Sequence, residues 1–277
     1  MLLTVGIVWL FGRQDLVVPM FIGAALAMVV DITMLYWIFD TPTYPADAAW
    51  PLGIATAETI IAAAERGKRA LLLIVGGIAG AVGQFLGIPM DIVGVCLIGN
   101  IWALLMFGVG LLVRAYSPVL FNVDINALYI PHGIMIGAGV VALIQIFAII
   151  RGKRLVKGEE ELGKEAVRTK GPEDLSRGLR NGFILYIVIA IILALVSGIY
   201  TDMGALMLIW WIIWVAISAL ISELMVGISA MHAGWFPGFA TALIFLVLGM
   251  LMGFPPLALV FLTGYTASTG PAFADLG

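Results

Sequence analysis

Long apolar stretches, separated by short polar or proline-containing breaks, dominate the chain. Six of them suit membrane-spanning helices, namely residues 16–39, 70–87, 92–113, 128–150, 183–200 and 204–227. A helix needs about 20 apolar residues to cross a bilayer. Four shorter ones, residues 1–12, 54–64, 239–253 and 257–273, predict half-spans or interfacial and re-entrant helices. The pattern predicts an all-α, polytopic transmembrane helical bundle with discontinuous or re-entrant helices, forming a single transmembrane domain over residues 1–277.

Composition supports membrane embedding. The 277 residues are 62% hydrophobic and 11% charged, whereas a soluble domain carries about 25% charged residues. Residues 151–180 hold nine of the fourteen Lys and Arg, so the positive-inside rule predicts a charged cytoplasmic loop there, either a solvated helix or a linker. Counting spans back from that loop puts the basic cluster at residues 66–69 outside, against the same rule, so the topology of residues 54–90 stays open. The sequence has no stripe of basic residues of the kind that would suggest nucleic-acid binding.

The stretch 221–275 carries features that a simple anchor helix does not need. It contains Glu223, His232, a Gly-Trp-Phe-Pro-Gly break at 234–238 and a small polar run at 263–269. Intramembrane carboxylates and broken helices are costly unless they are buried in protein or line a wet cavity. The stretch therefore predicts the site region of a transporter or channel, with the helix interrupted at Gly264 and Gly270.

Two spacings suggest an internal repeat. Glu58 and Glu223 are 165 residues apart, and the Gly-x-Pro breaks at 87–89 and 253–255 are 166 apart. An odd number of crossings between the copies would invert one relative to the other, as in many secondary transporters. Chance alignment is the alternative in a chain with 33 Gly and 12 Pro.

Glycines at four-residue spacing occur at 76/80, 83/87 and 133/137. Such pairs let helix backbones approach closely. Packing within the bundle is the simpler interpretation and a dimer interface the other.

Several motifs together resemble the oligopeptide transporter family, which includes the yellow-stripe-like transporters. WPLGIATAETIIAAAERGKRALLLIVGGIAG (50–80) resembles its Pro-x-Gly-x-Ala-x-Ala-Glu region, and IPMDIVGVCLIGNIWALLMFGVGLLVR with YIPHGIMIGAGVVALIQ is similar to the next block. ISELMVGISAMHAGWFPGFATALIF and LTGYTASTGPAFADLG resemble a later block of prokaryotic members. The resemblance covers most of the chain from about residue 40 onward.

The resemblance implies a secondary active transporter in the plasma membrane. It would couple proton entry to uptake of small peptides or of metal complexed to peptide-like chelators. Family members are much longer, so we expect a fragment or one chain of a split transporter, with a companion chain supplying the missing regions. A non-transporting subunit or remnant and a passive channel are the alternatives. No motif of an enzyme, a cofactor site or a protein-bound metal is present.

Three carboxylates are candidates for proton coupling or substrate binding. Glu58 occupies the Ala-x-Ala-Glu position of the resemblance, and its alternative is an exposed acid paired with Arg66. Glu223 lies in an otherwise uncharged span, with an interfacial position as its alternative. Asp31 lies deep in its span, where a hydrogen bond to a neighbouring helix is the alternative.

Four further side chains complete the candidate site. His132 and His232 flank helix breaks and titrate near neutral pH when unperturbed, although a lone histidine is more often structural. The Asn100 side chain is suited to hydrogen-bond either the backbone of a peptide substrate or a neighbouring helix. Tyr265 begins a polar run suited to lining a cavity.

Overall fold

The computed structural model describes residues 2–10, 12–48, 50–65, 67–86, 101–131, 169–233 and 238–270, with single helical residues between 133 and 144. Within these residues the fold is all-α, without a strand. The helices are α1 (Leu2–Leu10), α2 (Val17–Ile38), α3 (Pro51–Glu65), α4 (Lys68–Phe85), α5 (Ile101–Phe121), α7 (Pro172–Ser197), α8 (Ala205–Ala233), α9 (Gly238–Leu251) and α10 (Pro256–Ser268). Two 3₁₀ turns, Gln14–Leu16 and Ile199–Thr201, lead into α2 and follow α7.

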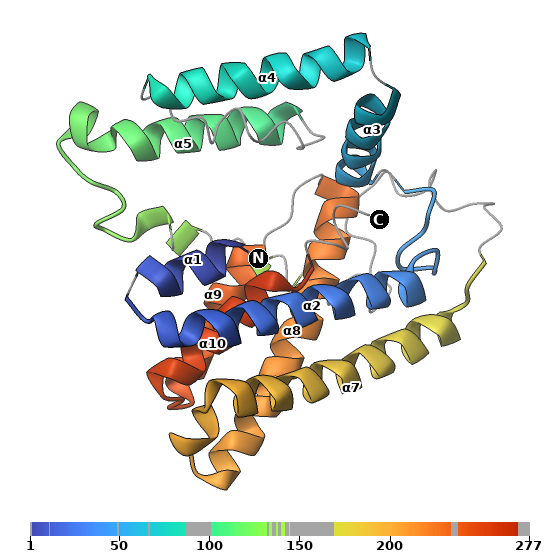
Figure 1. Cartoon of the computed structure of the whole chain (residues 1–277), viewed down its shortest axis with the longest axis vertical. Helices are drawn as coiled ribbons and strands as arrows, with labels where there is room; N and C mark the ends of the chain where they lie inside the picture. The colour runs from blue at the N-terminus through green and yellow to red at the C-terminus, as the bar shows by residue number, and fades with distance from the viewer. Residues whose placement is uncertain are drawn as a thin grey trace.

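The core of the molecule is a bundle of α2, α7, α8, α9 and α10. The most extensive contacts join α2 to α7, α7 to α8 and α9 to α10, and α10 also packs on α2 and α8. Figure 1 shows α10 lying between α2 and α8, while α4 and α5 lie away from this bundle. Helix α2, from the N-terminal part of the chain, therefore meets α8 and α9 around α10.

Proline and glycine set the ends of the bundle helices. Pro172 and Pro256 occupy the first helical turns of α7 and α10, where a missing N–H costs nothing. The α7 helix ends at Gly198, whose φ of +74° is the left-handed conformation that glycine adopts without strain. Gly253, with φ +80°, makes the corresponding turn between α9 and α10.

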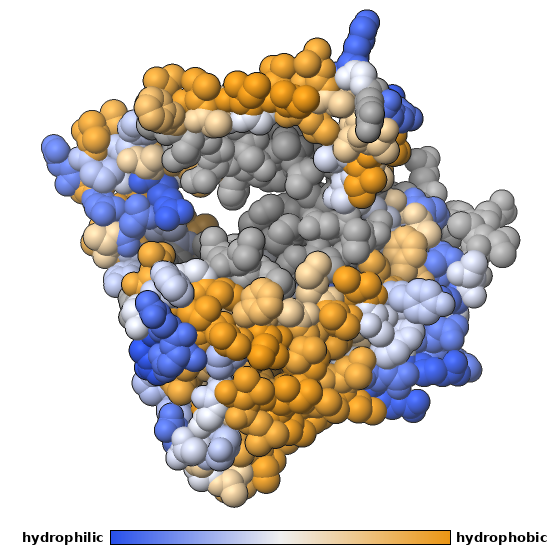
Figure 2. Space-filling view, in the orientation of Figure 1, coloured by the Kyte–Doolittle hydropathy of each residue, from blue (hydrophilic) through white to orange (hydrophobic). Residues whose placement is uncertain are grey.

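Three helices are long and apolar enough to cross a membrane, by length and composition: Gln14–Ile38, Pro172–Ser197 and Ala205–Met231. In contrast, α9 has 14 residues and α10 has 13. At 1.5 Å per residue each covers about 20 Å, short of the roughly 30 Å of a bilayer core. Figure 2 shows a broad hydrophobic face over the bundle with hydrophilic residues at its edges. The chain is thus a membrane-embedded helical protein that includes half-length helices.

Close approach of α2 and α7 depends on Gly178 and Gly182, one turn apart on α7. A Cβ added at Gly182 would lie 1.8 Å from Met34 Sδ, and one at Gly178 would lie 2.5 Å from Ile38 Cγ2. Among the described residues, the paired glycines at 76/80 and 133/137 do not play this role, because a Cβ there would meet none of the described atoms within 4 Å. The small-residue packing face lies in α7 instead.

Three boundaries differ from the sequence-based prediction. The helix expected to begin at residue 183 begins at Pro172, inside the charged stretch 151–180; residues 151–168 lie outside the described residues. The span expected to end at residue 113 continues to Phe121, past Arg114. The predicted interruption at Gly264 is wrong, because α10 runs unbroken through it.

The described helices fit the suggested repeat in part. Helices α4 and α9, which follow the two aligned glutamates, end at Phe85 and Leu251, 166 residues apart. The earlier Gly-x-Pro break lies outside the described residues. The repeat therefore stays a hypothesis.

Candidate functional site

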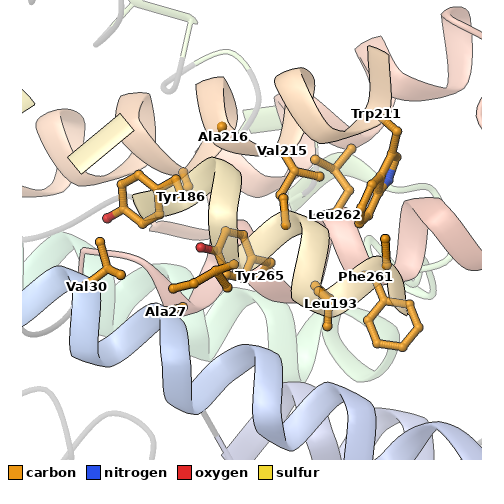
Figure 3. Packing of buried hydrophobic residues seen from close by; sticks show 14 of the residues in the cluster. Ala27, Val30, Tyr186, Leu193, Trp211, Val215, Ala216, Phe261, Leu262 and Tyr265 are labelled. Carbon is orange, nitrogen blue, oxygen red and sulfur yellow. The ribbon is translucent and has the colours of Figure 1, made fainter. Parts of the chain in front are cut away.

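Acidic and tyrosine side chains from four helices meet inside the bundle. Asp31 on α2 and Glu223 on α8 are 0% and 1% exposed. Tyr186 on α7 and Tyr265 on α10 are equally buried. Figure 3 shows the two tyrosines next to each other in the apolar core, among side chains of α2 and α8. We call Asp31, Glu223, Tyr186 and Tyr265 the acidic cluster.

Glu223 is the centre of this cluster. The Tyr186 hydroxyl donates a hydrogen bond to its Oε2, while its Oε1 is buried without a hydrogen-bond partner among the described residues. No Lys, Arg or His side chain in the described part of the chain forms an ion pair with Glu223. Asp31 is connected to the same part of α8 through Gly270, which bonds to Asp31 and packs on Val226, three residues after Glu223. Two buried carboxylates thus lie in one bundle core.

Asp31 links α2 to the end of α10. The backbone N–H of Gly270 donates to Asp31 Oδ2 at 3.0 Å. Gly270 has φ +98°, and an added Cβ would lie 2.7 Å from Val226 Cβ on α8. Only glycine combines this conformation with this close approach. The carboxylate of Asp31 thus holds the backbone that follows α10.

The two tyrosines pack edge to face, with ring centroids 6.1 Å apart and planes at 89°. The Tyr265 hydroxyl is buried without a hydrogen-bond partner among the described residues. Burying a hydroxyl without a partner costs about 1–3 kcal/mol. Glu223 Oε1 is likewise buried without a partner among the described residues, so the acidic cluster contains a donor and an acceptor that no described group satisfies.

Tyr44, in the loop between α2 and α3, covers the cluster from outside the spans. Its side chain is fully buried, and its hydroxyl donates to the Leu224 carbonyl oxygen at 3.3 Å. Burial raises the pKa of the Tyr44 hydroxyl well above its usual value, and the nearby charge of Glu223 raises it further. Tyr44 therefore stays neutral and fixes the loop to α8 one residue from Glu223.

A seam of hydroxyl groups joins α8 to α10 beside the cluster. Ser218 Oγ and Thr266 Oγ1 lie 2.7 Å apart, and Ser222 donates to the Thr266 carbonyl at 3.1 Å. Thr269 donates to the Ala219 carbonyl at 3.4 Å. These hydroxyls are fully buried. Hydrogen bonds rather than apolar side chains alone set the register of the two helices.

Glu58 does not join the acidic cluster. It lies on α3 with an exposed side chain, and its Oε2 is 3.2 Å from Arg69 Nη1. A buried, proton-coupling position for Glu58, one of the two interpretations of the sequence, does not match this exposed side chain. Glu58 is instead an exposed acid that pairs with Arg69. Arg66, the partner considered from the sequence, lies outside the described residues.

The remaining predicted residues cannot be placed against the cluster. Asn100 and His132 lie outside the described residues. The backbone of His232 belongs to the last turn of α8, but its side chain is outside what the structure describes. Of the predicted residues, the structure brings together Glu223, Asp31 and Tyr265.

Sequence reasoning missed Tyr186, Tyr44 and the α8 side of the hydroxyl seam, although the polar run 263–269 that supplies the α10 side was noted. Tyr186 is the one polar side chain in the run FILYIVIAIILALV (183–196), which was a usable signal. Ser218 and Ser222 precede Glu223 at helical spacing within an apolar span, a second such signal. Tyr44 gave no signal, because a tyrosine in a proline-rich loop is commonly exposed.

Comparison with known proteins adds nothing to this geometry: no protein-family model, curated protein or solved structure matches the chain.

Proposed function

We propose that the chain acts in secondary active transport and that the acidic cluster binds the coupling proton. One observation carries this proposal: Asp31 and Glu223 are buried together within the bundle, and no cation is paired with Glu223 in the described structure. Burying an ion costs several kcal/mol even after relaxation. One bound proton removes one of the two charges, so proton binding and helix packing are energetically linked.

The residues have distinct roles in this proposal. Glu223 takes up the proton, since its Oε1 is unused, and Tyr186 orients the carboxyl through Oε2. Asp31 keeps its bond to the Gly270 N–H. When Glu223 loses its proton, two negative charges oppose each other where α2, α8 and α10 meet. That repulsion favours a rearrangement that admits water.

The substrate class rests on the resemblance to oligopeptide transporters, which supports small peptides or metal chelates as cargo and a plasma-membrane location with several crossings. The half-length helices α9 and α10 support the same proposal, because transporters build midplane sites from such helices. A subunit that needs a companion chain is the second candidate. It is favoured by the apolar side chains along α4, such as Leu72 and Ile74, which are exposed.

Uptake into proteoliposomes tests the proposal. Proteoliposomes are made with the purified chain, alone and with any companion chain. A proton gradient is imposed across their membrane, and uptake of radiolabelled peptides and metal chelates is measured. We expect Glu223→Gln to abolish uphill accumulation while substrate exchange without a gradient persists. Asp202→Asn is the matched control, since Asp202 is an exposed carboxylate between α7 and α8.

Three other outcomes are informative. Undiminished uphill uptake by the Glu223→Gln variant would refute the role of Glu223. Downhill flux without accumulation in the wild type would favour a channel. Activity only with a companion chain would favour the subunit.

A further inference from the structure

Two adjoining clefts lie where α2 ends and α7 begins. The first, of about 540 Å³, is lined by apolar side chains of α2, including Ile32, Leu35 and Phe39. The second, of about 380 Å³, is lined by polar and basic groups of α7, including Arg177 and Asn181. Tyr36 and Lys170 line both clefts. An apolar groove thus continues into a basic one.

The basic groups keep donors for a ligand. The Lys170 ammonium donates to the Tyr36 carbonyl oxygen and lies 5.3 Å from the centre of the Tyr36 ring. An ammonium has three N–H donors and a guanidinium has five. Arg177 Nη1 is 3.5 Å from Asp174 Oδ1, and the Arg177 side chain is 62% exposed. Among the described residues, each cation thus has one polar contact and further N–H donors that a ligand can use.

The two acids that line the clefts are engaged with the protein. Asp40 Oδ2 accepts from the N–H and hydroxyl of Thr169, at 3.0 and 2.6 Å. Asp174 Oδ2 accepts the Gly171 N–H at 3.0 Å, which caps α7. Asp174 also lies 3.5 Å from Arg177 through its Oδ1. The lining of the second cleft therefore has two cations, Lys170 and Arg177, and one carboxylate, Asp174.

We propose that the two clefts together bind one anionic glycerophospholipid. Its phosphate lies between Lys170 and Arg177, and one acyl chain follows the apolar groove of α2. The location fits this ligand, because Ile38 and Pro172 are the ends of two candidate spans, where headgroups meet the protein. Basic pockets between helices at the cytoplasmic surface are suited to anionic headgroups. Tyr36 and Trp37 supply the aromatic side chains typical of that depth.

Spin-labelled lipids test the site in the whole chain. The protein is reconstituted in phosphatidylcholine vesicles with traces of labelled phosphatidylglycerol or labelled phosphatidylcholine, and the motionally restricted fraction gives relative affinity. We expect the wild type to prefer phosphatidylglycerol. Arg177→Gln should lower that preference about fivefold, and Lys170→Gln with Arg177→Gln should lower it further.

Arg180→Gln is the matched control, because Arg180 lies one turn further along α7 and lines neither cleft. It should leave the preference unchanged. Equal loss in the Arg177 and Arg180 variants would show general surface attraction and overturn the site. So would displacement of the labelled lipid by inorganic phosphate alone, or equal restriction of both lipids by the wild type. Arg177→Gln alone keeps the test valid if the Lys170 variant fails to fold.

Discussion

The contact between α2 and α7 gives a quantitative test of the fold through Gly182→Ala. The added methyl would lie 1.8 Å from Met34 Sδ and 2.7 Å from Met34 Cε. Met34 is fully buried, so its side chain cannot simply swing into solvent. Overpacking of this kind costs about 1–3 kcal/mol. Replacing a helical glycine by alanine returns about 1 kcal/mol of helix propensity.

Gly76→Ala on α4 is the matched control. Gly76 is also within a helix, but a Cβ there would meet no atom of the described part of the chain within 4 Å. The propensity gain is therefore common to both variants, and their difference isolates the steric cost. We expect Gly182→Ala to be less stable than Gly76→Ala by about 1–3 kcal/mol.

Thermal unfolding in detergent micelles, followed by circular dichroism, measures this difference. At about 2–4 °C per kcal/mol for a chain of this order of size, the two Tm values should differ by several degrees. Combining Gly182→Ala with Met34→Ala should cost less than the sum of the single changes, because the smaller side chain removes the clash. Equal Tm values for the two glycine variants, or additive costs with Met34→Ala, would refute the close contact.

Two further changes test the link between α8 and α10 by the same unfolding measurement. Gly270→Ala should destabilise the protein by about 2–4 kcal/mol, since it combines a left-handed φ with a clash against Val226; a neutral result would show that this backbone is placed differently. Ser218→Ala should cost only about 0.6 kcal/mol, because Thr266 keeps its bond to the Leu262 carbonyl; a loss above about 2 kcal/mol would mean that the seam carries more of the packing than its geometry indicates.

The acidic cluster was predictable in part, and the error at Glu58 shows why. The same signal, a carboxylate in an apolar helix, selected Glu58 and Glu223. Glu58 has Lys68 and Arg69 close in sequence, and it pairs with Arg69 at the surface. Glu223 is the only Asp, Glu, Lys or Arg in α8, so the helix supplies no Lys or Arg partner for it. The distance to the nearest basic residue in the sequence separates the two cases better than the apolar surroundings do.

Spatial assembly was not predictable from the same pattern. Asp31 and Glu223 each stood out as the charged group of an apolar span, whereas Tyr186 was missed. Nothing in the periodicity shows that α2, α7 and α8 turn these groups toward one another. The polar run 263–269 led to a wrong prediction of a helix interruption at Gly264. Thr263, Thr266 and Ser268 bond to carbonyls four residues earlier, so their hydroxyls are satisfied within an intact helix. A cluster of small polar residues does not by itself break a helix.

The unequal strength of the helix contacts indicates where proton-linked movement would occur if the proposed function holds. The α2–α7 contact is closed by direct backbone approach at Gly178 and Gly182. By contrast, α10 has 13 residues and is joined to α2 through Gly270 and Asp31 and to α8 partly through hydroxyl bonds, each worth about 0.6 kcal/mol. Repulsion between ionised Asp31 on α2 and Glu223 on α8 would push these two helices apart. Because α10 packs between them through the weaker contacts, α10 should move relative to α2 while α2 and α7 stay together. Spin labels at the exposed positions Val18, Val188 and Val260 would report the α2–α7 and α2–α10 distances against pH. A pH-dependent α2–α7 distance with a constant α2–α10 distance would contradict this reasoning.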